Sequence, residues 1–270
     1  MENVLVVERK IESGIPLEIW TLNRPEKLNA INSALIEALL LEGERLWQDL
    51  RQDLTSVRAL VVKAAGEKAF AAGADISEMN HFGRSKAQGF SERGQKAFGY
   101  FERLPIPTIA AIRGFALGGG LELAMCCDIL IATQNAQFGQ PEGALGLVPG
   151  FGASSRFLDR IGINKGLELL YSCRRIAAPE ALRLGLIQEV LAVDQNLEAR
   201  AIQLAVECGQ KSAPLSNRFV KEIAYKLRQK RFEELLSLES KYFGEIFESE
   251  DKKEGVEAFL AKRPAQFKGK

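Results

Sequence analysis

The sequence predicts an α/β fold followed by a helical C-terminal region, and two observations support this. Between Leu17 and about Ala136, patterns typical of strands and helices follow in the order strand, helix, strand, loop, strand, helix, strand. From Ile161 onward, helical signals dominate. Alternating strands and helices bury their apolar faces by packing in layers, so the first part is expected to form an α/β or related layered core.

Three elements of the first part follow from apolar spacing. Residues 17–22 alternate enough in polarity to form a strand, and residues 57–62 are an apolar run typical of a buried strand. Between them, apolar side chains recur on one side of residues 34–53, which predicts a helix. Asn32 or Ser33 is expected to cap this helix.

The middle of the chain mixes buried strands with segments of small residues. Residues 108–112 and 128–132 are expected to be buried strands, with an apolar helix over residues 121–125 between them. Residues 70–76 are small, which suits close contact between the backbone and a ligand. Residues 80–93 are polar and contain glycine, so we expect a mobile loop or a loosely held helix there.

The last part of the chain is expected to be helical. Amphipathic patterns cover residues 197–208, 216–229, 232–248 and 254–260. The aromatic and aliphatic side chains of residues 232–248 present more apolar surface than one isolated helix could hide. We expect that surface to be divided between the core of the chain and a subunit interface.

The composition argues against several classes of protein. The 270 residues are 46% apolar with a net charge of +1, so the chain can build a core but lacks the basic excess of a nucleic-acid-binding protein. No apolar run is long enough to cross a bilayer, and the N-terminus resembles neither a signal nor a transit peptide. We expect a cytoplasmic location, or an organelle matrix if a presequence has been removed.

Cysteine and histidine usage limits the chemistry that the chain can perform. Cys126, Cys127, Cys173 and Cys208 form no CxxC pair, so free buried thiols are expected and a metal site is not. His81 is the only histidine and lies in a polar stretch, where a solvated role is expected. Acid–base catalysis would therefore depend mainly on carboxylates.

Three glycines at residues 118–120 open the helix predicted over residues 121–125, and they are the most informative motif. Glu122 falls in the first turn, and Glu142 follows Pro141 twenty residues further on. The first N–H groups of a helix lack internal partners, and glycine lets a ligand reach bare backbone. The motif can therefore present donors to a developing oxyanion, with two carboxyl groups nearby for proton transfer.

A structural interpretation of this motif is also available. Glycine triplets often form tight turns, and most glutamates are solvated. However, Glu122 lies within an apolar segment between two buried strands, where an unpartnered charge is costly. This setting favours a functional role for Glu122.

These residues resemble the enoyl-CoA hydratase (crotonase) family, and in particular its short-chain enoyl-CoA hydratase or 3-hydroxybutyryl-CoA dehydratase members. The pair of glutamates is the most specific part of the resemblance. The matching segments span nearly the whole chain in the expected order: Asn-Arg-Pro at 23–25, Ala-Ala-Gly-Ala-Asp-Ile at 71–76, the glycine motif at 114–128, Phe-Gly-Gln-Pro-Glu at 138–142, Pro-Gly-Phe-Gly at 149–152 and the Glu-Gly…Lys-Arg pattern at 254–263.

The resemblance implies a crotonase-like spiral of ββα units, with a catalytic core over residues 1–200 and a helical trimerisation region over residues 201–270. It implies a homotrimer, or a homohexamer built as two trimers, with no nucleic-acid or membrane partner. The implied reaction is reversible addition of water to a 2-enoyl-CoA thioester to give a 3-hydroxyacyl-CoA, as in fatty-acid β-oxidation. No separate cofactor is implied, because CoA is part of the substrate. Pathway, acyl length and stereochemistry stay open.

The resemblance also implies roles for individual residues. The backbone N–H groups of Ala74 and Gly119 would form the oxyanion hole, and Glu122 and Glu142 would be the acid–base pair. Phe259 and Lys262 match positions that meet the adenine end of CoA, from a neighbouring subunit. The substrate-binding set is Ala72, Gly73, Asp75, Ile76, Gly118, Pro141, Gly150, Phe259 and Lys262.

The settings of the two glutamates suggest how they divide the work. The helix dipole favours the ionised form of Glu122, which would hold and activate water. The apolar surroundings of Glu142 favour its neutral form, which would protonate C2. The two would titrate as a coupled pair. We expect residues 149–152 to shape the wall near Glu142 and residues 76–100 to cover the acyl chain.

Some positions depart from the family pattern or admit another role. Ser77, Ala153 and Cys173 replace residues usual in hydratases, which affects CoA affinity and the acyl pocket more than the reaction. Asp75 follows the oxyanion-hole alanine, and we expect it to cap a turn rather than act as a nucleophile.

Three alternatives to hydration remain. An enoyl-CoA isomerase shares the fold but needs only one base, and other crotonase-fold acyl-CoA lyases usually place different residues at the glutamate positions. A non-enzymatic RNA-binding paralogue is the third. Both carboxylates and the near-neutral charge favour the hydratase.

Overall fold

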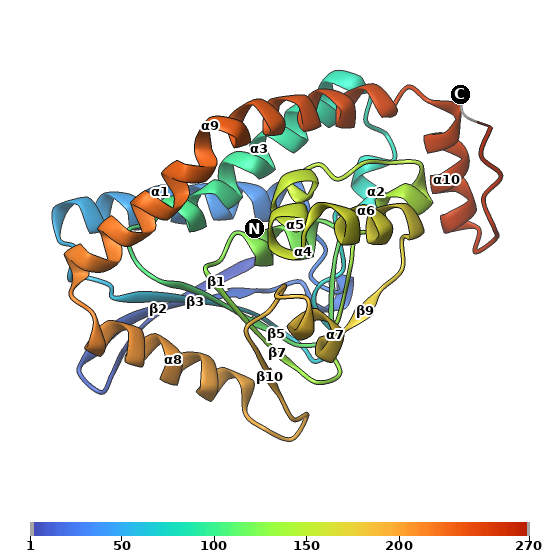
Figure 1. The fold of residues 1–270 in the computed structure, drawn as a ribbon. Helices are drawn as coiled ribbons and strands as arrows, with labels where there is room; N and C mark the ends of the chain where they lie inside the picture. The colour runs from blue at the N-terminus through green and yellow to red at the C-terminus, as the bar shows by residue number, and fades with distance from the viewer. Residues whose placement is uncertain (1–2, 269–270) are drawn as a thin grey trace.

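Two β-sheets form the framework of the fold (Figure 1), and the computed structural model describes residues 3–268, apart from the side chains of residues 226–235. The larger sheet has the strand order β1-β2-β3-β5-β7-β10 and the smaller one β4-β6-β8-β9. All neighbours pair in parallel except β1 with β2 and β8 with β9. The larger sheet comprises β1 (Leu5–Glu12), β2 (Ile15–Leu22), β3 (Ala59–Ala64), β5 (Thr108–Ile112), β7 (Ile129–Thr133) and β10 (Glu189–Leu191), and the smaller comprises β4 (Ala69–Ala71), β6 (Phe115–Leu117), β8 (Gln137–Gly139) and β9 (Ile176–Ala177).

Three successive ββα units supply the strands β3 to β8 of the two sheets. In each unit the first strand joins the larger sheet, the second joins the smaller sheet, and helical structure follows. This arrangement confirms the expected spiral of ββα units. The units are β3-β4 with α2 (Ile76–Met79) and α3 (Arg84–Arg103), β5-β6 with α4 (Gly119–Met125), and β7-β8 with the 3₁₀ helix η2 (Glu142–Leu145) and α5 (Ala153–Ile161).

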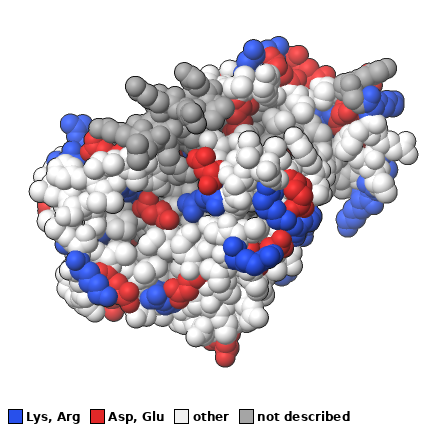
Figure 2. Space-filling model, viewed as in Figure 1, with Lys and Arg blue, Asp and Glu red and all other residues white. Residues whose placement is uncertain are grey.

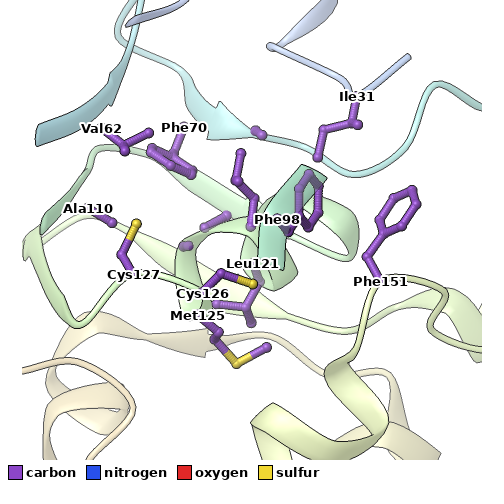
Figure 3. Close-up of a cluster of buried hydrophobic side chains, with 14 of the residues drawn as sticks. Ile31, Val62, Phe70, Phe98, Ala110, Leu121, Met125, Cys126, Cys127 and Phe151 are labelled. Carbon is purple, nitrogen blue, oxygen red and sulfur yellow. The ribbon is translucent and has the colours of Figure 1, made fainter. Parts of the chain in front are cut away.

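Alternation along the central strands builds a core on both faces of the larger sheet. In β3, Leu60 and Val62 join the main core cluster, whereas Val61 faces the second cluster under α8 (Leu197–Lys211). Helix α1 (Ser33–Gln52) contributes apolar side chains to the main cluster, and the side chain of Asn32 caps it by accepting from the Leu35 N–H at 2.9 Å, as predicted. Figure 3 shows part of this cluster.

The four cysteines are free thiols, as expected, but they differ in burial. Cys126 and Cys127 follow α4 directly and are buried. Figure 3 shows them among the side chains of the main cluster. Cys173 and Cys208 are only partly buried.

Helix α9 (Pro214–Ile246) lies on the α3 side of the larger sheet, whereas α8 lies on the opposite side (Figure 1). Helix α9 is one continuous helix packed along α3, where two helices were expected. Its Phe243 is buried and its Tyr242 is 49% exposed, so part of the apolar surface packs in the core, and the subunit interface stays a prediction. The expectations for side chains 226–235 lie outside the described residues. The remaining helices are η1 (Pro25–Lys27), α6 (Ile163–Ser172), α7 (Ala178–Arg183) and α10 (Glu250–Leu260).

The division at residue 200 falls inside α8, which packs against the larger sheet. The assignment of residues 1–200 and 201–270 to a core and a trimerisation region stays a prediction.

The expectation of a mobile loop or loose helix at residues 80–93 is wrong for most of that stretch. Helix α3 begins at Arg84, and Ala87 and Phe90 are buried on its inner side. The helical pattern is hard to see in the sequence because small residues occupy contact positions. A Cβ on Gly94 would lie 2.2 Å from the Phe151 ring, so this glycine allows the close packing.

The surface shows no segregation of charge on the face drawn in Figure 2, where basic and acidic side chains are interspersed. Among the described residues, no helix has the length and apolar character needed to cross a membrane.

Gly114 lies at the corner between β5 and β6, and we predict that Gly114→Ala is strongly destabilising. The residue has φ +64°, and a Cβ would lie 2.0 Å from the Lys68 carbonyl oxygen. Left-handed strain and the backbone clash together should lower the free energy of unfolding by about 3 kcal/mol or more, measured by urea denaturation.

The matched control for this substitution is Gly14→Ala. Gly14 has φ +79°, but no atom lies within 4 Å of the position that a Cβ would take, so only the conformational strain of about 1 kcal/mol applies. Equal losses at the two positions would show that the close approach to Lys68 is unimportant.

Candidate active site

The predicted functional segments converge at the carboxyl ends of the smaller sheet's parallel strands. Residues 72–74 follow β4, residues 118–119 follow β6, and Glu142 lies shortly after β8. Because these strands run in parallel as neighbours, their ends meet at one edge. The segments line one cavity of about 500 Å³.

Most of the predicted site residues line this cavity, and two do not. Asp75 instead accepts from the Ser77 N–H at 3.2 Å and pairs with Arg24 at 3.0 Å, so it caps α2 as the turn interpretation predicts. Lys262 lies beyond α10, away from the cavity lining. The lining members are Ala72, Gly73, Ala74, Ile76, Gly118, Gly119, Glu122, Pro141, Glu142, Gly150 and Phe259.

Phe259 reaches the cavity from α10 of the same chain, where a neighbouring subunit was expected to supply it. The side chain is 57% exposed, which places it at the open part of the cavity. Helix α10 comes this close because Gly255 packs directly on η2: a Cβ there would lie 2.4 Å from the Leu145 carbonyl carbon. The binding roles of Asp75, Phe259 and Lys262 remain predictions.

Each glycine of the triplet is required by a different neighbour. Gly118 has φ +48°, and a Cβ on it would lie 2.8 Å from Glu142 Oε1. A Cβ on Gly119 would meet the Phe151 ring at 3.0 Å. A Cβ on Gly120 would lie 2.1 Å from the Ala71 carbonyl oxygen. The triplet therefore brings α4 against β4 while leaving room for the second carboxyl group.

Two backbone N–H groups at the cavity are available as donors. The bridge between Ile31 and the segment after β4 uses the Gly73 carbonyl and the Asp75 N–H, so it leaves the Ala74 N–H unused. Gly119 is the first residue of α4, where N–H groups have no intrahelical acceptor. The position of a Cβ on Gly119 is 3.5 Å from the Ala74 nitrogen, so the two donors belong to one site.

Glu122 is buried in the first turn of α4, with 1% of its surface exposed. Its Oε1 accepts from the Phe151 N–H at 2.8 Å and the Ala153 N–H at 2.9 Å. Burial raises its pKa well above the usual value, and the charges of Glu239 and Glu142 add to this, against the lowering effect of the two N–H bonds. The raised pKa runs against the expectation that the helix dipole would favour the ionised form of Glu122.

Glu142 begins η2 and lines the cavity opposite Gly118. Burial raises its pKa to about 8, as its apolar setting predicts, with the charge of Glu239 as a further cause. With its amide nitrogen facing the carboxyl group, Gln140 donates to Glu142 Oε1 at 2.8 Å and Oε2 at 3.1 Å. Gln140 is buried and was not singled out from the sequence, although a polar residue between apolar neighbours was a signal.

Fewer of residues 76–100 line the cavity than the predicted cover of the acyl chain requires. From residues 76–100, only Ile76 and Met79 line the cavity. Phe90 and Phe98 are buried behind the wall instead, where they contact the Phe151 ring in a tilted and an edge-to-face arrangement, at ring-centroid distances of 5.4 and 5.1 Å. These aromatic contacts support the Phe151 wall predicted at residues 149–152.

The positions that depart from the family pattern have separate places. Ser77 is exposed on α2, Ala153 donates its N–H to Glu122, and Cys173 lines the cavity. His81 lies in the turn after α2, outside the cavity lining. In the described part of the chain, no group of three or more His, Cys, Asp or Glu side chains is arranged to hold a metal ion.

Comparison with known proteins agrees with this architecture. The model of the enoyl-CoA hydratase/isomerase family matches residues 12–270. The chain is 39% identical to a short-chain-enoyl-CoA hydratase of Clostridium acetobutylicum, covering 94% of each chain. It is 39% identical to a crotonyl-CoA hydratase of Syntrophomonas wolfei, covering 95% of this chain and 96% of the relative.

A solved structure extends the comparison to the fold. The carnitinyl-CoA hydratase of Mycobacterium avium superposes with a TM-score of 0.84 at 33% identity, covering 100% of both chains. The family match begins at the last residue of β1 and covers the other strands of both sheets, both glutamates and the C-terminal helices described above. The chain therefore belongs to the enoyl-CoA hydratase/isomerase family.

Proposed function

We propose that this chain is a hydro-lyase that adds water reversibly to a 2-enoyl-CoA thioester to give a 3-hydroxyacyl-CoA. The observation that carries this proposal is the meeting of two carboxyl groups and two available N–H donors in one cavity. Hydration needs a base for water, an acid for C2 and donors for the thioester oxygen. The names of the relatives as hydratases support the same reaction.

The geometry assigns a role to each group. Glu122 Oε1 is held by two N–H groups, which leaves Oε2 to bind water. The ionised form of Glu122, whose fraction the raised pKa reduces at neutral pH, takes the proton of that water. As the water oxygen bonds to C3, the C2=C3 electrons move toward the thioester oxygen, where the Ala74 and Gly119 N–H groups stabilise the charge. Glu142, the group whose pKa is raised to about 8, then gives its proton to C2.

A short acyl chain fits the cavity best. The deep wall is formed by buried apolar side chains that include Met79, Phe151 and Phe243. Behind Phe151, the α3 aromatics leave no loose segment to yield to a longer chain. Two relatives are named for short-chain or crotonyl substrates, which supports the same preference.

The proposed assembly is a homotrimer or a dimer of trimers. Exposed apolar side chains near the start of α9 support it, because a surface of this kind is suited to subunit contact. They are Leu215, Phe219, Val220 and Ile223. The cytoplasmic or matrix location and a role in fatty-acid β-oxidation remain predictions.

The isomerase and RNA-binding alternatives have weaker support. Isomerisation needs one carboxylate, whereas two line the cavity here. Interspersed surface charge does not favour RNA binding.

We predict that the purified protein removes the enoyl-thioester absorbance of crotonyl-CoA rapidly, with rates that fall as the acyl chain lengthens. The reason is the wall of buried apolar side chains beside the carboxyl pair. The measurement is that absorbance across a series of 2-enoyl-CoA esters, with 3-enoyl-CoA as the control substrate. Turnover of 3-enoyl-CoA without hydration of any 2-enoyl-CoA would overturn the proposal in favour of the isomerase.

The variants Glu122→Gln and Glu142→Gln should each lose roughly 10²- to 10⁴-fold in kcat, because each removes one proton-transfer group. KM should change little, since neither substitution alters the shape of the cavity wall. Stopped-flow and steady-state kinetics with crotonyl-CoA test this. Near-normal kcat in either variant is incompatible with a two-carboxylate mechanism.

Hydration should lose rate as pH rises through about 8. The pKa of Glu142 is raised, so its proton is present at neutral pH and is lost above this value, after which no acid remains for C2. The measurement is kcat at saturating crotonyl-CoA between about pH 6 and pH 10, corrected for hydrolysis of the ester without enzyme. A rate that shows no decline above about pH 8 would contradict the assignment.

A further inference from the structure

Four successive backbone N–H groups, at residues 151–154, are shared alternately between two buried carboxyl groups. Glu122 takes those of Phe151 and Ala153. Glu239, from the C-terminal helix α9, accepts from Gly152 N–H at 2.5 Å and from Ser154 N–H at 3.0 Å. The Ser154 hydroxyl also donates to Glu239 Oε2. Glu239 is 6% exposed and does not line the cavity.

The carbonyl groups of the same turn are also held. The Phe151 carbonyl accepts from Arg156 Nη1 at 2.8 Å, and the Arg156 guanidinium makes a two-point contact with Glu102 on α3. The Gly150 carbonyl accepts from Ser91 and Gln95 of α3. Gly152 has φ +109°, and a Cβ there would lie 1.9 Å from Arg156 Nη1. A residue with a side chain therefore does not fit at this position of the turn.

We propose that Glu239 is a positioning residue for the acid–base pair: by holding the Gly152 and Ser154 N–H groups, it aims the Phe151 and Ala153 N–H groups at Glu122. The inference rests on the proposed hydratase function. It follows from the alternating pattern of the four hydrogen bonds. A turn that lost the two bonds to Glu239 would no longer hold the other two N–H groups at fixed angles to Glu122. Catalytic groups displaced even slightly from their working geometry lose much of their effect.

Electrostatics gives Glu239 a second influence on the same pair. The charged groups facing it are Arg156 on α5, with its partner Glu102 on α3, Glu122 on α4 and Glu142 on η2. The charge of Glu239 contributes to the raised pKa of both Glu122 and Glu142. Removing this charge should therefore lower the pKa of Glu122 and of Glu142. As the pH is raised, activity should then be lost at a lower pH than in the wild type.

The test compares Glu239→Gln and Glu239→Asp with the matched control Glu245→Gln. Glu245 lies on the same helix, but its side chain is 37% exposed and pairs with Arg84 at 2.9 Å. Glu239→Gln should lower kcat for crotonyl-CoA roughly 10- to 100-fold with little change in KM, and shift the high-pH limb downward. Glu239→Asp keeps the charge, but its side chain is one methylene shorter. Its high-pH limb should therefore lie where the wild-type limb lies, while its kcat should stay as low as that of Glu239→Gln. Glu245→Gln should match the wild type.

Amide hydrogen exchange at residues 151–154 provides a readout that does not depend on activity. The N–H groups of Phe151 and Ala153 should exchange faster in Glu239→Gln than in the wild type or in Glu245→Gln, while the exchange of β3 stays unchanged. If the wild type is inactive but the three proteins show this exchange pattern, the hydratase function is rejected and the positioning role of Glu239 in the turn stands. Unchanged exchange, or wild-type kcat together with an unshifted high-pH limb in Glu239→Gln, would overturn the role of Glu239.

Discussion

Keeping two carboxyl groups inside an apolar cavity is the constraint on which the rest of the site depends. A buried charge without partners is costly, so each carboxyl group needs hydrogen-bond donors that are held in fixed positions. Glu122 receives backbone N–H groups from the turn before α5, and Glu142 receives the amide of Gln140. Both sets of donors are themselves buried or fixed by further bonds. The surrounding helices thus act mainly by holding these donors in place.

The smaller sheet explains how distant segments reach one site. Its parallel strands are very short, and each ends where a functional segment begins. Close approach of the backbone at the glycines lets these segments meet. Gly118 and Gly120 meet the Glu142 carboxyl group and the Ala71 carbonyl at distances that admit no Cβ. The larger sheet supplies the rigid core behind them.

Much of this could be predicted from the sequence, and the misses have identifiable causes. The glycine triplet and the glutamate pair were visible because they break an apolar pattern. The strands β4, β6 and β8 were missed because three residues are too few to show periodicity. The raised pKa of Glu122 was not anticipated because its burial, and the charges of Glu239 and Glu142 that add to the effect, depend on segments distant in the sequence. Glu239 was overlooked because nothing local marks a helical glutamate as buried; its partners lie on a turn more than eighty residues earlier.

The position of α9 and α10 in the chain has a consequence for how the molecule matures. Both sheets, the glycine triplet and both cavity glutamates precede α9, whereas Phe259 and the Glu239 contacts come after it begins. Since synthesis proceeds from the N-terminus and segments fold as they emerge, the sheets can assemble around an incomplete site. Binding capacity and catalytic geometry are then completed together in one late docking step.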